Sequence, residues 1–224
     1  MNLAIKSLLG LVNLTVLMCL AIFLPAGSIH YIEAWYYLLI FFTGVIAISI
    51  YIFIKDKHLL QSRLKAGATA EKRPFQKWVQ GLAFFGFLGM YVLAGFDHRL
   101  HWSRVPLWLV VVSDVILVFT MLLFFIVFRK NSYLSAVVEV QKGQRVIDNG
   151  PYGVVRHPMY SAALLLFVFS PLSLASFWAL LTLPLMILVL VLRSLDEEEA
   201  LKTELPGYSA YCKRVRYRLI PWIF

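Results

Sequence analysis

Four apolar runs, each about as long as a lipid bilayer is thick, recur along this chain of 224 residues. A helix needs roughly 20 apolar residues to cross a membrane. The runs lie near Ser7–Leu24, Ile32–Ile54, Trp78–Phe96 and Val105–Phe128. Hydrophobic residues make up 61% of the chain and charged residues 15%, whereas soluble domains average about 45–50% and 25%. The sequence therefore predicts an integral membrane protein without a sizeable soluble domain.

A fifth apolar stretch, Pro158–Leu192, is too long for one span and short for two. Pro171 and several serines interrupt it, and a proline inside a helix removes a backbone hydrogen bond. We expect a tight helical hairpin here, with Pro184 kinking its second arm. The predicted fold class is all-α. It is a polytopic transmembrane helical bundle with four full spans plus a C-terminal helical hairpin.

We expect two regions in this bundle. Residues 1–130 would hold the N-terminal transmembrane helices. Residues 131–224 would hold a C-terminal cofactor-binding region with the hairpin and a polar tail.

Basic residues gather in segments that share one predicted side of the membrane. Of the 21 Lys and Arg residues, 19 lie at Lys6 or in the segments 55–77, 129–156 and 193–224. Such a bias marks the cytoplasmic side. Both termini are then predicted to be cytoplasmic, with the polar C-terminal region on the same side. No basic face with interleaved aromatic residues lies outside the membrane zone, so we expect no nucleic-acid partner.

The membrane spans and the loops on the other side of the membrane contain only isolated polar residues, which offer little chemistry. Asp114 is the one acidic residue well inside a span, which makes it either a site residue or a helix-packing hydrogen bonder. Asp97, His98 and His101 cluster in an outer loop, but two histidines without a convincing third ligand do not predict a metal site. We therefore predict no bound metal.

Dense polar chemistry follows in two strips near the C-terminal end. The first, Gly150–Tyr160, contains Arg156 and His157 just before a helix start, and the second runs from Arg193 to Glu199. On a helix, Arg193 and Glu197 share a face and can pair. A tail with Tyr208 and Tyr211, and then Tyr217–Pro221, comes after them.

These residue types suit S-adenosylmethionine, which carries a sulfonium cation, an amino group, a carboxylate, ribose hydroxyls and adenine. Carboxylates such as Glu197 or Glu198 can accept hydrogen bonds from the ammonium or the ribose. Tyrosines such as Tyr211 can face the sulfonium or stack on the adenine. Composition alone leaves a plainer alternative open, in which Arg156 and His157 anchor the chain at the membrane surface and Glu197–Glu199 end a solvated helix.

The order of these motifs resembles one family. Gly-Pro-Tyr-x-x-x-Arg-His-Pro-x-Tyr (Gly150–Tyr160), Arg-x-x-x-Glu-Glu-x-x-Leu (Arg193–Leu201), Tyr-x-x-Tyr and Arg-x-x-Pro (Arg218–Pro221) are similar to the isoprenylcysteine carboxyl methyltransferase family. That family is related to the phospholipid N-methyltransferases. The resemblance covers about a third of the chain, from about Gln144 onward. Gln144 and Arg145 stand where the family often has a histidine.

The resemblance implies a cofactor pocket capped by the tail and reached by the acceptor from the bilayer. The residues implied or favoured as cofactor contacts are Val146, Ile147, Tyr152, His157, Pro158, Met159, Tyr160, Glu197, Glu198 and Tyr211. The residues implied in catalysis are Arg193, at the junction with an anionic acceptor group, and Glu197.

The sequence thus predicts an S-adenosylmethionine-dependent membrane methyltransferase with a lipidic or membrane-partitioned acceptor. The acceptor group, a carboxylate, thiol or amine, stays open, as does the oligomeric state. One alternative is an NADPH-dependent membrane reductase of the sterol-reductase type, against which the short chain and the lack of a glycine-rich fingerprint argue. The other is a non-enzymatic membrane scaffold or transporter subunit, for which only Asp114 offers chemistry.

Overall fold

A computed structural model describes residues 2–64, 70–71 and 73–224. The described residues form eight α-helices and two short 3-10 helices, with no strand among them. The predicted all-helical bundle is therefore confirmed. Lys65 and Lys72, which belong to the first predicted basic segment, lie outside the described residues.

Four long helices correspond to the four predicted spans. They are α1 (Leu3–Ala26), α2 (Ile32–Lys55), α4 (Pro74–Leu100) and α5 (Leu107–Lys130). Each is long and apolar enough to cross a membrane. Their outward side chains are largely apolar and exposed, as expected for helix faces that contact lipid tails rather than water.

The C-terminal hairpin also forms. Its arms are α6 (Pro158–Ser173) and α7 (Leu183–Glu204), and the 3-10 helix η2 (Trp178–Thr182) leads into α7. The segment from Trp178 to Glu204 is a fifth candidate span, whereas α6 is shorter. Pro184 does not kink the second arm. It lies in the first turn of α7, where its missing N–H costs no helical hydrogen bond.

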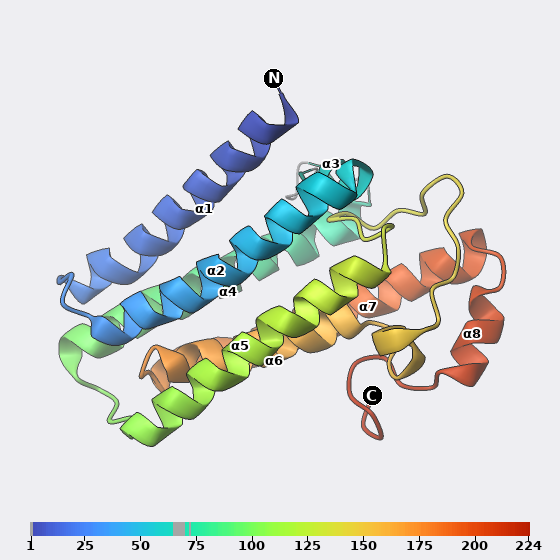
Figure 1. Ribbon diagram of the computed structural model, residues 1–224. Helices are drawn as coiled ribbons and strands as arrows, with labels where there is room; N and C mark the ends of the chain where they lie inside the picture. The colour runs from blue at the N-terminus through green and yellow to red at the C-terminus, as the bar shows by residue number, and fades with distance from the viewer. Residues whose placement is uncertain (1, 65–69, 72) are drawn as a thin grey trace.

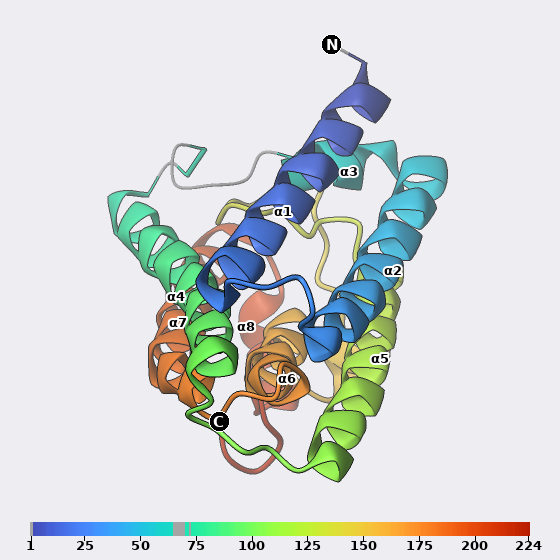
Figure 2. The same ribbon diagram turned by 90° about the vertical axis from the view of Figure 1, so that its left-hand side faces the viewer.

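The long helices pack in pairs around α6. The α1 helix lies along α4, α2 along α5, α4 along α7, and α5 along α6. Figure 2 shows α6 between the α4–α7 pair and the α2–α5 pair. Helices α1 and α4 cross closely at Gly95. A Cβ added to this glycine would lie only 2.4 Å from the carbonyl oxygen of Ile22. Glycine therefore fits a position where the helix backbones nearly touch.

Buried polar groups inside the bundle bond to one another. The hydroxyls of Tyr37 and Tyr91 lie 2.6 Å apart, and Ser170 donates to Tyr37 over 3.2 Å. Asp114 accepts a hydrogen bond from Ser173 of α6, which fits the helix-packing role for this carboxylate. Hydrocarbon offers no hydrogen-bond partner, so such internal pairing is required of polar groups at this depth.

Asp97 ties the outer loop to the turn of the hairpin. Its carboxylate accepts hydrogen bonds from Ser103 N at 2.7 Å and from the hydroxyls of Ser103 at 2.6 Å and Ser176 at 2.5 Å. His98 stacks on Tyr31 with ring centroids 3.9 Å apart. The prediction that this cluster lies in an outer loop is wrong for Asp97 and His98, which belong to the last turn of α4, and both have ordinary packing partners.

The opposite end of the bundle carries the polar chemistry. The short helix α3 (Lys57–Leu64), the segment from Asn131 to His157, and α8 (Tyr208–Arg214) all lie there, as Figure 1 shows. The basic segments of the sequence therefore meet at one end of the molecule. The start of α6 and the end of α7 reach the same end, which places both predicted polar strips side by side.

Candidate functional site

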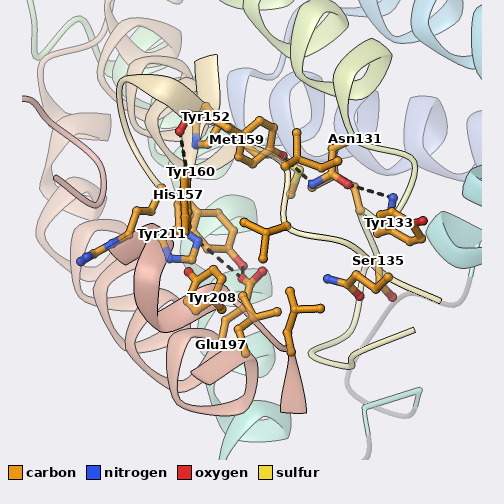
Figure 3. A pocket seen from close by; sticks show the side chains of 18 of the residues that line it. Asn131, Tyr133, Ser135, Tyr152, His157, Met159, Tyr160, Glu197, Tyr208 and Tyr211 are labelled. Atoms are coloured by element: carbon orange, nitrogen blue, oxygen red, sulfur yellow. Dashed lines mark hydrogen bonds and ion pairs between the residues drawn. The ribbon is translucent and has the colours of Figure 1, made fainter. Parts of the chain in front are cut away.

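A pocket opens at this polar end of the bundle. Its walls come from the segment 131–147, the 3-10 helix η1 (Gly150–Gly153), the start of α6, the end of α7 and α8 (Figure 3). The predicted site residues that line it are Val146, Ile147, Tyr152, His157, Pro158, Met159, Tyr160, Arg193, Glu197 and Tyr211. Glu198 is the predicted residue that does not line it. The fold thus gathers strips that lie some 40 residues apart in the chain.

Local sequence sets the shape of the first strip. Gly150 has a left-handed φ of +60°, which glycine adopts without strain, and it opens the turn of η1. Pro158 then occupies the first turn of α6, where proline is favoured. Arg156 and His157 are held between the turn and the helix, and both are buried.

The tail holds this strip from the other side. The backbone N–H groups of Arg156 and His157 donate to the carbonyls of Tyr217 and Arg218, each over 2.9 Å. The Ser161 hydroxyl donates to the carbonyl of Leu219 over 2.6 Å. The segment after α8 therefore supports the first strip from behind, and the last residue of the chain that lines the pocket is Tyr211 of α8.

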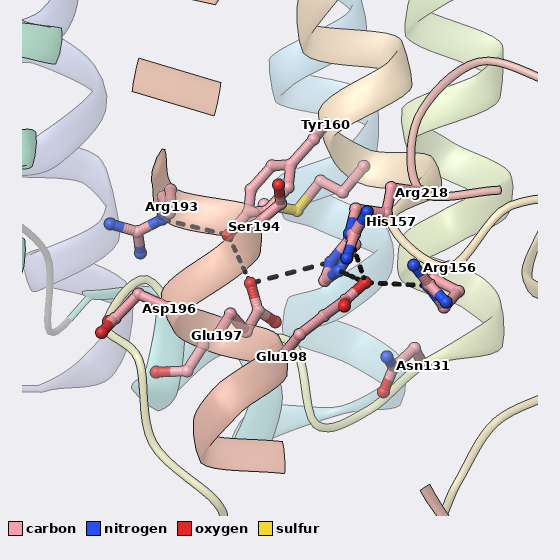
Figure 4. Close-up of polar contacts among 12 residues, drawn as sticks. Asn131, Arg156, His157, Tyr160, Arg193, Ser194, Asp196, Glu197, Glu198 and Arg218 are labelled. Carbon is pink, nitrogen blue, oxygen red and sulfur yellow. Dashed lines mark hydrogen bonds and ion pairs between the residues drawn. The ribbon is translucent and has the colours of Figure 1, made fainter. Parts of the chain in front are cut away.

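Glu198 lies behind the pocket wall and pairs with basic side chains from three segments. Its Oε1 lies 2.8 Å from Arg156 Nε, 3.3 Å from His157 Nε2 and 3.2 Å from Arg218 Nε. Lys202 approaches Oε2 at 3.5 Å. The residue is only 1% exposed. This buried carboxylate thus joins the first strip, α7 and the tail (Figure 4).

Glu197 faces the pocket instead. It accepts a hydrogen bond of 2.5 Å from the Tyr160 hydroxyl, which in turn accepts one of 3.1 Å from Arg193 Nε. The predicted pair of Arg193 and Glu197 is therefore not direct, because the Tyr160 hydroxyl lies between them (Figure 4). The Glu197 side chain remains 31% exposed, so it can accept further hydrogen bonds from a ligand.

Three tyrosines form an aromatic wall. The Tyr152 hydroxyl accepts from Asn131 Nδ2 at 2.9 Å, and the Tyr152 carbonyl accepts from the Tyr211 hydroxyl at 2.7 Å. The Tyr208 hydroxyl is buried and has no hydrogen-bond partner among the described residues. Burial raises the pKa of all three phenols above the ordinary value. They therefore stay neutral, and Tyr208 retains an unused donor in the pocket lining.

Several lining residues were not predicted. Asn131, Tyr133, Ser135 and their neighbours up to Glu139 form one wall. This stretch has no regular hydrophobic period, and its one sequence signal is its position directly after the last basic turn of α5. Gln144 and Arg145, named as departures from the family pattern, also line the pocket, as does Tyr208 of the tail motif.

The division of the chain at residue 130 stays a prediction.

Among the described residues, no group of three or more His, Cys, Asp or Glu side chains could hold a metal ion. The pocket instead combines the carboxylates of Glu139 and Glu197 with guanidinium groups, an imidazole, neutral phenols and aromatic faces. Such a lining can accept hydrogen bonds from an ammonium or hydroxyl group and can attract a cation to its ring faces.

A comparison with protein families agrees with this site. The phospholipid methyltransferase family model matches residues 108–205, which run from the start of α5 to the end of α7. A search of curated protein sequences gave no significant match. The matched region contains both polar strips and the hairpin between them. The match supports the conclusion that this chain is a membrane methyltransferase whose residues 108–205 are similar to the phospholipid methyltransferases.

Proposed function

We propose that the pocket binds S-adenosylmethionine and that the protein transfers its methyl group to an acceptor drawn from the membrane. The observation that carries this proposal is the convergence of both polar strips and the tail on one pocket. The alternative of a surface anchor does not account for it, because the side chains of Arg156, His157 and Glu198 are turned inward and buried. We further propose that this end of the bundle faces the cytoplasm, since basic residues concentrate there.

The residues present fit this cofactor. Glu197 offers an accessible carboxylate oxygen for its ammonium or ribose hydroxyls, and Tyr208 offers an unpaired hydroxyl. His157 and Tyr160 stack on each other with ring centroids 5.4 Å apart, and both line the pocket. An aromatic face attracts a cation such as a sulfonium. Val146 and Ile147 add apolar side chains to the pocket lining.

When bound, S-adenosylmethionine supplies an electrophilic methyl group on a positively charged sulfur. The acceptor atom forms a bond to the methyl carbon as the carbon–sulfur bond breaks, and the sulfur leaves as a neutral thioether. A carboxylate or thiolate acceptor needs no base for this step. The protein's contribution is then to hold the two reactants in line and to exclude water. An amine acceptor would also have to lose a proton, for which Glu197 is the accessible base.

A thermal-shift titration of the full chain in detergent tests the cofactor. A ligand that binds only the native state raises the apparent melting temperature. S-adenosylmethionine and S-adenosylhomocysteine are expected to stabilise the protein, and NADPH is not. Stabilisation by NADPH alone would instead favour the reductase.

Two variants assign the residues. His157→Ala is expected to abolish stabilisation by S-adenosylmethionine, because it removes a ring from the pocket wall. Arg193→Ala is expected to leave most of the binding and to remove S-adenosylhomocysteine formation in membranes. Glu199→Gln, an exposed neighbour on the same helix, is the matched control. Normal binding and turnover in both site variants would show that the assignment is wrong.

A further inference from the structure

Residues 218–224 form a tight turn, the tail turn, at the end of the segment that follows α8. The backbone N–H groups of Arg218 and Leu219 donate to the carbonyl oxygen of Phe224 over 2.8 and 2.9 Å. In return, Phe224 N donates to the carbonyl of Ile220 over 3.1 Å. Trp222 has a left-handed φ of +65°, which residues other than glycine rarely adopt. The tail turn is therefore held in one conformation by its own backbone hydrogen bonds.

The two faces of the tail turn have different surroundings. On the inner face Leu219 is buried, and Ile220 and Phe224 pack into the same apolar cluster. On the outer face the Trp222 and Ile223 side chains are 85% and 77% exposed. Neither of these two residues lines the pocket. The outer face is thus an apolar surface that the protein leaves uncovered, and such a surface commonly marks a contact with lipid or with another protein.

The tail turn lies at the level of the apolar helices. The Ser161 hydroxyl, in the first turn of α6, donates to the carbonyl of Leu219 over 2.6 Å. The cluster around Leu219 also includes Phe167, in the middle of α6, and Leu190, which belongs to the candidate span Trp178–Glu204. Figures 1 and 2 both show the chain ending beside α6, on the side away from α1. The exposed outer face therefore points into the zone that lipid fills around the bundle.

Basic side chains precede the tail turn at the same end of the molecule. Arg214 pairs with Asp148, whereas Lys213 and Arg216 are exposed and form no ion pair with a described residue. Tryptophan favours the headgroup level of a membrane, and lysine and arginine at that level attract anionic lipids. The combination of exposed Trp222 with unpaired basic side chains is therefore the chemistry of a segment that lies in a membrane interface.

We propose that the tail turn contacts the lipid bilayer. Trp222 and Ile223 enter the region of the headgroups and the upper acyl chains, and Lys213 and Arg216 meet anionic headgroups. The partner is the bilayer, because the turn packs on α6 and α7 at the level of the spans and turns its apolar face outward.

This contact would restrain a support of the pocket. The carbonyls of Tyr217 and Arg218, at the start of the tail turn, accept the backbone hydrogen bonds of Arg156 and His157. Lipid on the outer face and protein on the inner face would hold this support from both sides. The inference goes beyond the proposed function and does not depend on it, since its test needs neither a methyl donor nor an acceptor.

Fluorescence quenching in bilayers tests the contact. The full chain is placed in nanodiscs of phosphatidylcholine whose acyl chains are either plain or brominated, because bromine quenches tryptophan at contact range. The chain has six tryptophans, so the Trp222 signal is obtained as the difference between wild type and Trp222→Phe. The control is Lys142→Trp in the Trp222→Phe background, which places a tryptophan at an exposed position outside the pocket lining.

The Trp222 signal is expected to lose most of its intensity in brominated lipid, whereas the Lys142→Trp signal is expected to keep its intensity. A Trp222 signal that is not reduced in brominated lipid would overturn the contact. Acrylamide, a water-soluble quencher, then identifies what replaces it. Quenching by acrylamide would place the outer face in water, and protection from it would show that a protein surface, such as a second copy of this chain, covers the turn.

Mixed bilayers test the basic side chains. Phosphatidylcholine and phosphatidylglycerol are used in equal amounts, and one of the two carries the bromine. Trp222 is expected to be quenched more strongly when phosphatidylglycerol is brominated, because basic residues near the surface attract anionic lipid. The double variant Lys213→Gln/Arg216→Gln is expected to reduce this excess. An excess that stays unchanged would overturn the assignment of these two residues to the headgroups.

Discussion

The hydroxyl of Tyr160 donates to Glu197 Oε2 over 2.5 Å, and the Tyr160 hydroxyl oxygen itself accepts a hydrogen bond of 3.1 Å from Arg193 Nε. One phenol therefore orients the accessible carboxylate of the pocket and keeps the guanidinium at a fixed place beside it. The first strip and α7 are coupled through this single atom.

Replacing Tyr160 by phenylalanine removes that coupling and keeps the ring that stacks on His157. Hydrogen bonds to charged groups contribute about 1.5–3 kcal/mol. Tyr160→Phe is therefore expected to weaken S-adenosylhomocysteine binding by about tenfold or more, with an equal or larger loss of methyl transfer in membranes. Isothermal titration measures the binding. Tyr51→Phe, on α2 where the Tyr51 ring packs against Phe125, is the control, and unchanged affinity in Tyr160→Phe would contradict the orienting role.

Removal of the Glu198 carboxylate is expected to destabilise the fold. Glu198→Ala leaves the buried cation of Arg156 without its partner, and breaking a buried ion pair in this way costs about 3–5 kcal/mol. The variant is expected to have a markedly lower melting temperature in detergent without ligand. Glu199→Ala removes an exposed carboxylate of the same helix and is expected to melt like wild type. Equal melting of the two variants would show that the cluster does not stabilise the fold.

The segment after α8 is expected to be necessary for the pocket. Deleting residues 217–224 removes the carbonyls that accept from Arg156 N and His157 N. Stabilisation by S-adenosylmethionine should then be lost, while far-ultraviolet circular dichroism still shows the membrane helices. The double variant Trp222→Ala/Ile223→Ala is the control, since these side chains are 85% and 77% exposed. Full ligand response in the deletion variant would exclude a role for the tail.

Two glycines of α4 test the helix crossing. Gly95→Ala places a methyl group against the backbone of α1, and such overpacking typically costs about 1–3 kcal/mol. Gly81→Ala meets nothing within 4 Å, and alanine in a helix is favoured over glycine by about 0.5–1 kcal/mol. The melting temperature should fall in the first variant and hold or rise in the second. A reversed order would show that α1 and α4 do not pack so closely.

Much of the fold could be predicted because hydropathy and helix length are local properties. The spans, the hairpin and the gathering of basic segments follow from them. The roles of adjacent acidic residues do not. Successive helix residues point about 100° apart, so only the packing of α7 decides that Glu197 faces the pocket and Glu198 the cations. Tertiary packing likewise brings Arg63 to Met159, 96 residues further along the chain.

The docking of the tail has a consequence for biosynthesis. Tyr217–Phe224 leaves the ribosome after helices α1 to α7, yet its carbonyls hold Arg156 and His157 in place. The bundle can thus enter the bilayer before the pocket is complete. If the pocket binds the methyl donor as we propose, a nascent chain would gain that ability only once this segment folds back, so insertion and the onset of activity would be separate events in time.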